Sequence, residues 1–154
     1  MIVIGIDPDS NKHGVATYEG GMLKSLAMMT RHEIIEDIES YIYTGRRVVL
    51  GIENVKANNF VYARNNKATK AEQAKVGLSI GRCQQAQTEL ECDLIKIGVP
   101  FMLYNPTGKN FSRRKEEFQH ITGWTKQSNE DTRSAAYFGL RALGDLAIQE
   151  RTTA

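Results

Sequence analysis

Acidic residues stand at the ends of two apolar runs and at the start of a third segment. Asp7 directly follows IVIGI, Glu53 directly follows VVLGI, and Asp131, preceded by Glu130, opens a segment rich in Ala and Leu. If the two runs are neighbouring parallel strands, Asp7 and Glu53 lie at the sheet edge where open α/β proteins bind ligands. Close carboxylates repel unless a cation neutralises them, and oxygen ligands favour Mg²⁺ or Mn²⁺.

Each acid also has a purely structural explanation. Asp7 can cap a turn, Glu53 can pair with Lys56, and Glu130 and Asp131 can stabilise a helix N-terminus. Taken together, the acids favour a site with two divalent ions about 4 Å apart, which activates water and stabilises the leaving oxygen in phosphodiester hydrolysis. The residues alone therefore predict a metal-dependent nuclease.

Basic residues gather in two segments although the net charge is only +2. Between residues 54 and 75, five basic residues face the single acid Glu72, and the same segment carries two aromatic residues. A solvated surface explains one such segment, but two of them indicate a polyanionic partner such as DNA. The candidate DNA-binding residues are Lys56, Phe60, Tyr62, Arg64, Lys67, Lys70, Lys109, Arg113 and Arg114.

For these acids to lie close together, the chain should form a sheet flanked by helices. Short apolar runs predict five strands, at residues 2–6, 13–18, 22–28, 47–53 and 99–104. A helix should begin after Thr30, which forms a capping box with Glu33, and stop at Gly45; further helices are expected at residues 70–98, 112–121 and 129–148. The first three strands should form a meander, with the later strands parallel to the first. Residues 54–68 should form a polar loop.

Length and composition indicate one ordinary globular domain over residues 1–154. Hydrophobic residues make up 41% of the chain and charged residues 25%, and no apolar run is long enough to span a membrane. The chain shows no signal-peptide pattern, so we expect the cytoplasm. Cys83 and Cys92 are nine residues apart in one expected helix, too far for a disulfide, so we expect both to be reduced.

The sequence resembles the RuvC-like Holliday-junction resolvases of the ribonuclease H-like superfamily. IGIDPDSNKHGVA is similar to their first-strand motif, IENV to their second acidic motif, and RRKEEFQHI to their basic helix. The polar loop and the long helix with GLSIGRCQQA also fit. The resemblance implies a five-stranded mixed sheet flanked by helices and a dimer that nicks two strands of a branched DNA symmetrically. The short chain and its unusual last motif resemble a phage or mobile-element version.

The resemblance also implies roles for particular residues. Asp7, Glu53 and Asp131 would bind Mg²⁺, with Mn²⁺ as a substitute and two ions per site, and Lys115 would support the phosphate or the transition state. Lys109 is a weaker match to a second such lysine. The family places two acids three residues apart in its last motif, but here Ser134 follows Asp131, so Glu130 is a candidate substitute.

Two alternatives to a junction resolvase stay open. A protein that binds junctions but has weak or lost cleavage would explain Ser134, and an RNA-processing nuclease would keep the fold and change the substrate.

A further departure from the family's pattern is Lys56, at a position where some relatives have an aromatic residue that wedges the junction open. Phe60 or Tyr62 can do that from the loop.

Overall fold

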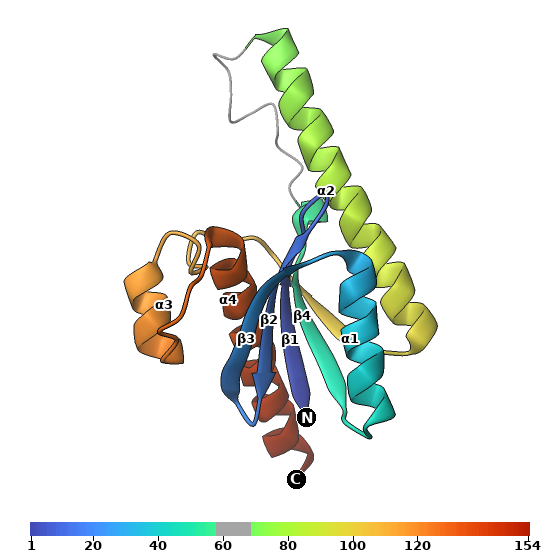
Figure 1. The fold of residues 1–154 in the computed structure, drawn as a ribbon, viewed down its shortest axis with the longest axis vertical. Helices are drawn as coiled ribbons and strands as arrows, with labels where there is room; N and C mark the ends of the chain where they lie inside the picture. Colours follow the sequence, from blue (N-terminus) through green and yellow to red (C-terminus); the bar gives the residue numbers. More distant parts are fainter. Residues whose placement is uncertain (58–68) are drawn as a thin grey trace.

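The computed structural model describes residues 1–57 and 69–154. The described part contains one five-stranded sheet, four α-helices and a short 3₁₀ helix (Figure 1). In chain order the elements are β1 (Ile2–Asp7), β2 (His13–Glu19), β3 (Met22–Met29), α1 (Arg31–Tyr43), β4 (Val48–Glu53), η1 (Val55–Ala57), α2 (Lys70–Ile97), β5 (Phe101–Tyr104), α3 (Lys115–Thr122) and α4 (Glu130–Thr153).

The strands lie in the order β3-β2-β1-β4-β5. β1, β2 and β3 pair antiparallel as the predicted meander, and β4 and β5 are parallel to β1. The expected mixed sheet is therefore confirmed. In the parallel register Ile6 lies opposite Ile52, so the next residues, Asp7 and Glu53, emerge side by side at the carboxyl edge of the sheet.

Helices cover both faces of the sheet, with α1 and α2 on one face and α4 on the other (Figure 1). Side chains alternate between the two faces of a strand, so the even residues of β1 lie in the core beneath α1 and α2 and Val3 lies in the core beneath α4. β4 alternates likewise, with Leu50 toward α1 and α2 and Val49 toward α4. By this period, Asp7 and Glu53 both face α4.

Glycines in the sheet allow α4 to approach unusually closely. A Cβ atom added at Gly5 would lie 1.9 Å from the carbonyl oxygen of Ala135, and one at Gly51 would lie 2.4 Å from that of Phe138. Both distances are far below van der Waals contact, so only glycine fits. The glycines thus set the depth at which α4 packs, and with it the distance from the start of α4 to the two strand-end acids.

Gly5→Ala should destabilise the protein by about 3 kcal/mol, the upper end for an overpacked core, because the methyl group overlaps backbone that cannot rotate away. Urea unfolding would measure this loss. Gly144→Ala is the matched control: Gly144 lies in α4 with open space around its Cα, so the same change should stabilise the protein, by up to about 1 kcal/mol. Equal effects at both positions would contradict the close packing.

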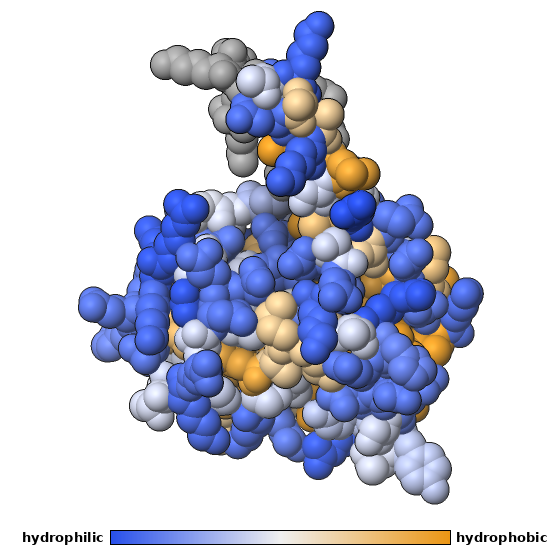
Figure 2. Space-filling view, turned by 45° about the horizontal axis from the view of Figure 1, so that its top comes forward, coloured by the Kyte–Doolittle hydropathy of each residue, from blue (hydrophilic) through white to orange (hydrophobic). Residues whose placement is uncertain are grey.

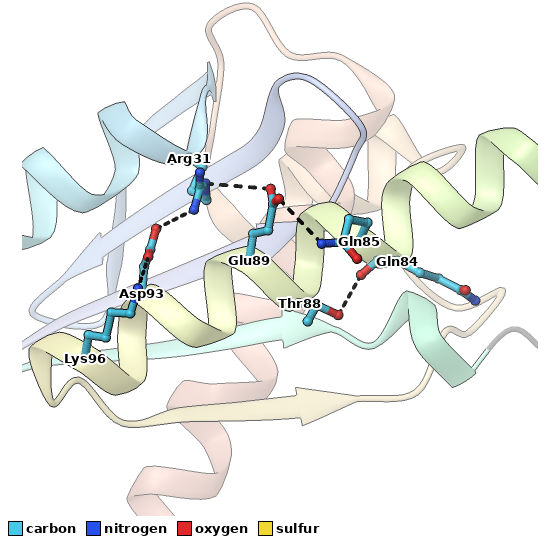
Figure 3. Close-up of polar contacts among 7 residues, drawn as sticks. All are labelled: Arg31, Gln84, Gln85, Thr88, Glu89, Asp93 and Lys96. Atoms are coloured by element: carbon cyan, nitrogen blue, oxygen red, sulfur yellow. Dashed lines mark hydrogen bonds and ion pairs between the residues drawn. The ribbon is translucent and has the colours of Figure 1, made fainter.

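Polar contacts join the start of α1 to the second half of α2 (Figure 3). The guanidinium of Arg31 donates to Asp93 at 2.9 Å and lies 4.0 Å from a carboxylate oxygen of Glu89. The α1 N-terminus is closed by the predicted capping box of Thr30 and Glu33. These contacts hold α1 and α2 together as one layer.

The first half of α2 extends beyond the sheet (Figure 1). The buried residues of α2, Gln87, Leu90 and Leu94, all lie in its second half, whereas Val76 and Leu78 in its first half are exposed. Figure 2 shows apolar patches among the hydrophilic surface of this projecting part. The helix ends at Ile97, one residue before the predicted end, and Gly98 caps it in the left-handed conformation.

Three predicted boundaries differ from the structure by two or more residues. α4 continues to Thr153, past the expected end at residue 148. β5 begins at Phe101 instead of Val99, because the Val99 N–H donates to the Leu94 carbonyl and closes the end of α2. α3 begins at Lys115 instead of Ser112, because the Ser112 carbonyl accepts a hydrogen bond of 2.6 Å from Arg133. Both cysteines are free. No helix in the described ranges has the length and apolar character needed to cross a membrane.

Candidate active site

Asp7 and Glu53 form a close, half-buried pair of carboxyl groups beneath α4. Burial and, to a smaller extent, charge repulsion and a shared hydrogen bond with the neighbouring Glu53 raise the pKa of Asp7 to about 9. Burial also raises the pKa of Glu53, with a further contribution from the charge of Asp131. Without a cation, the pair therefore retains a proton at neutral pH.

α4 adds Asp131 to the same edge. Asn129 caps the helix and forms a capping box with Thr132, which fixes the orientation of the first turn. The side chain of Asp131 is half-buried and its charge raises the pKa values of both Asp7 and Glu53, whereas Glu130 is exposed. The structure thus brings Asp131, and not Glu130, toward the pair.

Ser134 lies one turn further along α4 and is buried, with 1% of its surface exposed. Its hydroxyl faces Asp7 and lowers the pKa of that carboxyl, but it does not reach good hydrogen-bond geometry with any group in the described part of the chain. A buried hydroxyl without a partner costs free energy. Ser134 therefore presents, next to Asp7, a hydroxyl oxygen that lacks a hydrogen-bond partner among residues 1–57 and 69–154 and could serve as a cation ligand.

Sequence reasoning missed Asp9, which it assigned to a simple turn. The charge of Asp9 raises the pKa of Asp131, so the two carboxylates are neighbours. One oxygen of Asp9 accepts hydrogen bonds from the Ser10 N–H at 2.6 Å and the Cys83 thiol at 3.5 Å, and the Asp9 N–H donates to Nδ1 of buried His13. The turn that carries Asp9 is thus part of the site. In the sequence, the second acid of DPD was the signal that could have identified Asp9.

The donors at this edge suit a divalent cation with oxygen ligands. Asp7 and Glu53 supply paired carboxylates, and Ser134 supplies the unpartnered hydroxyl. Across residues 1–57 and 69–154, however, no three His, Cys, Asp or Glu side chains form a ready-made cluster for a metal ion. The best-supported ligands are thus the pair Asp7 and Glu53, with Asp131 beside them.

A cleft of about 590 Å³ opens beside Glu53. Its far wall is the loop between β5 and α3, residues 105–114, which contributes Arg113 and Arg114. Buried Arg133 holds this loop by donating to the carbonyls of Phe111 and Ser112 at distances between 2.6 and 3.2 Å. The cleft is therefore lined by an acid and by two arginines, and the loop that carries the arginines is anchored to α4.

The other predicted basic residues lie outside this cleft. Lys115 is exposed at the first position of α3, and Lys109 lines a neighbouring groove between α3 and α4. Lys56 forms an ion pair of 2.5 Å with Glu91 of α2, and Gln87 joins Glu91 to Asn54, so Lys56 also fastens η1 to α2. Lys70 is exposed at the far end of α2. Phe60, Tyr62, Arg64 and Lys67 lie outside the described residues.

The acidic pair predicts an unusual pH dependence of stability. Asp7 ionises near pH 4 when unfolded but has a pKa of about 9 when folded, so the unfolded chain loses its proton first. Without divalent cations, this group should lower the free energy of unfolding as pH rises from about 4 to about 9, by up to about 1.4 kcal/mol per pH unit. Urea unfolding in EDTA at several pH values would measure this slope, and Asp7→Asn should flatten it. If the free energy of unfolding changed with pH equally in the wild-type protein and in Asp7→Asn, the close pairing of Asp7 with Glu53 would be contradicted.

The mixed sheet with helices on both faces and acids at its carboxyl edge defines the class of the fold, which is ribonuclease H-like, as predicted. The structure is similar to that of RuvC from Thermus thermophilus in complex with a Holliday junction substrate, with a TM-score of 0.61 and 15% identity over 97% of this chain and 96% of that one. A second Thermus thermophilus RuvC structure gives a TM-score of 0.56 and 17% identity over 97% of each chain.

Comparisons beyond solved structures find no relatives. No protein-family model matches the chain, and no curated protein matches it. At 15–17% identity, the similarity to RuvC establishes a shared fold over nearly the whole chain.

Proposed function

We propose that the protein is an endonuclease that cuts four-way (Holliday) and other branched DNA by metal-dependent phosphodiester hydrolysis, in DNA recombination or repair. The observation that carries the proposal is the close, half-buried Asp7–Glu53 pair beside a cleft that Arg113 and Arg114 also line. Two carboxylates that repel each other are stabilised when they bind a divalent cation, and arginines in the same cleft can bind a phosphate. The fold shared with a RuvC that was solved in complex with a Holliday junction substrate supports the choice of DNA.

In this proposal the residues of the cleft have different roles. Asp7 and Glu53 hold Mg²⁺ or Mn²⁺ with Asp131 beside them, while Arg113 and Arg114 hold the DNA backbone and Lys115 supports the phosphate from the start of α3. Two bound ions supply an activated water and stabilise the leaving oxygen. Ser134 positions its hydroxyl toward Asp7 from α4. The protein acts on DNA in the cytoplasm.

We also propose that the protein acts as a homodimer. A four-way junction needs one nick in each of two strands, which a two-fold dimer supplies with one site per subunit. The projecting half of α2 supports this assembly, because Val76 and Leu78 are exposed there and Gly81 has open space around its Cα. Two such helices can pack closely at a glycine.

A comparison of substrates tests this function. With Mg²⁺, the protein should nick a labelled four-way junction symmetrically and cut a linear duplex of the same sequence at least about 10-fold more slowly. Tight junction binding without any cleavage by the wild-type protein would favour a junction-binding protein. Faster cleavage of an RNA–DNA hybrid would favour an RNA-processing nuclease of the same superfamily. Either result would overturn the proposal.

A further inference from the structure

A second groove, of about 340 Å³, lies between α3 and α4 next to the cleft. We call it the α3–α4 groove. It is lined by apolar side chains, among them Ile121 of α3 and Leu140 of α4, and by three basic side chains that we call its rim, Lys109, Arg114 and Arg141. Such a rim attracts an anionic chain, and apolar surface between the cations suits sugar and base faces better than free ions.

The charges in the groove are only partly neutralised. Glu117, the one acid among the described residues that line it, pairs with Arg114 at 3.0 Å. Asp145 accepts a hydrogen bond of 2.6 Å from the Tyr104 hydroxyl, and its negative charge raises the pKa of Arg141 and so offsets part of the charge of that arginine. No acid within the described residues forms an ion pair with Lys109 or Arg141. The groove therefore keeps a positive rim.

Arg141 is held in place before any ligand arrives. Its guanidinium carbon lies 5.0 Å from the centroid of the Tyr104 ring, and Nη1 donates to the Tyr137 hydroxyl at 3.4 Å. No other hydrogen bond from this guanidinium occurs in the described part of the chain. An arginine fixed against an aromatic ring loses little entropy when its remaining N–H groups bind a phosphate.

The groove continues the cleft, because Arg114 lines both. Along α4, Arg141 follows Asp131 by ten residues, or about 15 Å at the rise of an α-helix. A DNA strand advances about 3.4 Å per nucleotide, so this length corresponds to roughly four nucleotides. A strand whose cut phosphate lies at the acids can therefore reach Arg141.

We propose that the α3–α4 groove binds the DNA backbone roughly four nucleotides from the phosphate that is cut, with Arg141 as its farthest phosphate ligand. The inference rests on the proposed function and extends it, since it assigns a binding surface and a direction to the DNA strand. An acidic segment of another protein is the competing occupant. The link through Arg114 to the acid-bearing cleft favours DNA.

Junction binding by Arg141→Ala tests the proposal, measured in EDTA and in Ca²⁺ so that cleavage plays no part. Loss of one phosphate contact should weaken binding by about tenfold at moderate salt and reduce the slope of log affinity against log salt by about one. Arg141→Lys should keep most of the slope. Lys96→Ala is the matched control, because Lys96 is an exposed cation on α2, on the opposite face of the sheet, and its removal should change neither quantity.

Phosphate ethylation locates the contact. In the wild-type protein, ethylating the phosphate roughly four nucleotides from the cut should impair binding, and Arg141→Ala should lose only that sensitivity. Unchanged salt slope and ethylation pattern in Arg141→Ala would overturn the proposal in favour of another occupant, as would equal losses in Lys96→Ala. Failure of the wild-type protein to bind any junction would instead overturn the proposed function itself, before the variant is compared.

Discussion

Asp7→Asn should reduce the rate of junction cleavage by about 10³-fold or more while leaving junction binding nearly intact. Asp7 is the most strongly perturbed acid of the site, and asparagine keeps its shape but removes the charge that would hold a cation. Losing about 4 kcal/mol of transition-state stabilisation corresponds to this factor. Single-turnover cleavage of a labelled junction in Mg²⁺, with binding measured separately in Ca²⁺, gives both numbers.

The same variant should be more stable than the wild-type protein in EDTA at pH 8, by about 2 kcal/mol or more. Burial raises the pKa of Asp7 to about 9, so the folded protein bears a cost at this pH that the neutral asparagine avoids. Glu39→Gln on the exposed side of α1 likewise replaces a carboxylate by an amide away from the site and should alter neither cleavage nor stability appreciably. Full cleavage activity in Asp7→Asn would show that the catalytic centre lies elsewhere.

Ser134→Asp should make the fold depend on divalent cations. The new carboxylate would be buried next to Asp7 and Glu53, and an uncompensated buried charge costs about 3 kcal/mol or more. We expect a corresponding loss of stability in EDTA at pH 8. Because an added carboxylate strengthens cation binding, Mn²⁺ should restore more stability in this variant than in the wild-type protein. Thermal unfolding over a Mn²⁺ titration measures both effects without DNA.

Ser134→Asn is the matched control for that experiment. Asparagine has nearly the volume of aspartate but no charge, so it should show the cost of packing without the gain in response to Mn²⁺. Ser134→Ala should be slightly stabilising in EDTA, by about 1 kcal/mol, because it removes a buried hydroxyl without a partner. If Ser134→Asp and Ser134→Asn respond equally to Mn²⁺, Ser134 does not face a cation site.

The sequence predicted the sheet and its acidic edge because short-range patterns determine them. Apolar runs, turns and capping residues are local, and the register of parallel strands then follows from where each run ends. A further local signal was available but unused: both acid-bearing strands end in Gly-Ile followed by the acid. The structure shows why, since Gly5 and Gly51 admit the α4 backbone, and the acids come two residues later on the same face.

Other features of the site depend on contacts between distant segments, which one sequence does not reveal. Arg133 looks like an ordinary surface residue of an amphipathic helix, yet it is buried and holds residues 111 and 112. That contact also moved the start of α3 to Lys115. Lys56 was predicted to meet DNA, and only the packing of η1 against α2 revealed its pairing with Glu91. The metal ligands and the roles of the basic residues stay predictions.

The most direct test of the catalytic centre is the position of Mn²⁺ in a crystal of the protein soaked with that ion. Anomalous scattering identifies manganese without relying on activity or on DNA. We predict a strong peak between the carboxyl groups of Asp7 and Glu53, close to Asp131, and its loss in Asp7→Asn. A wild-type crystal with manganese bound only elsewhere, or with no peak at this edge at saturating concentration, would contradict a metal-dependent nuclease centre at Asp7 and Glu53.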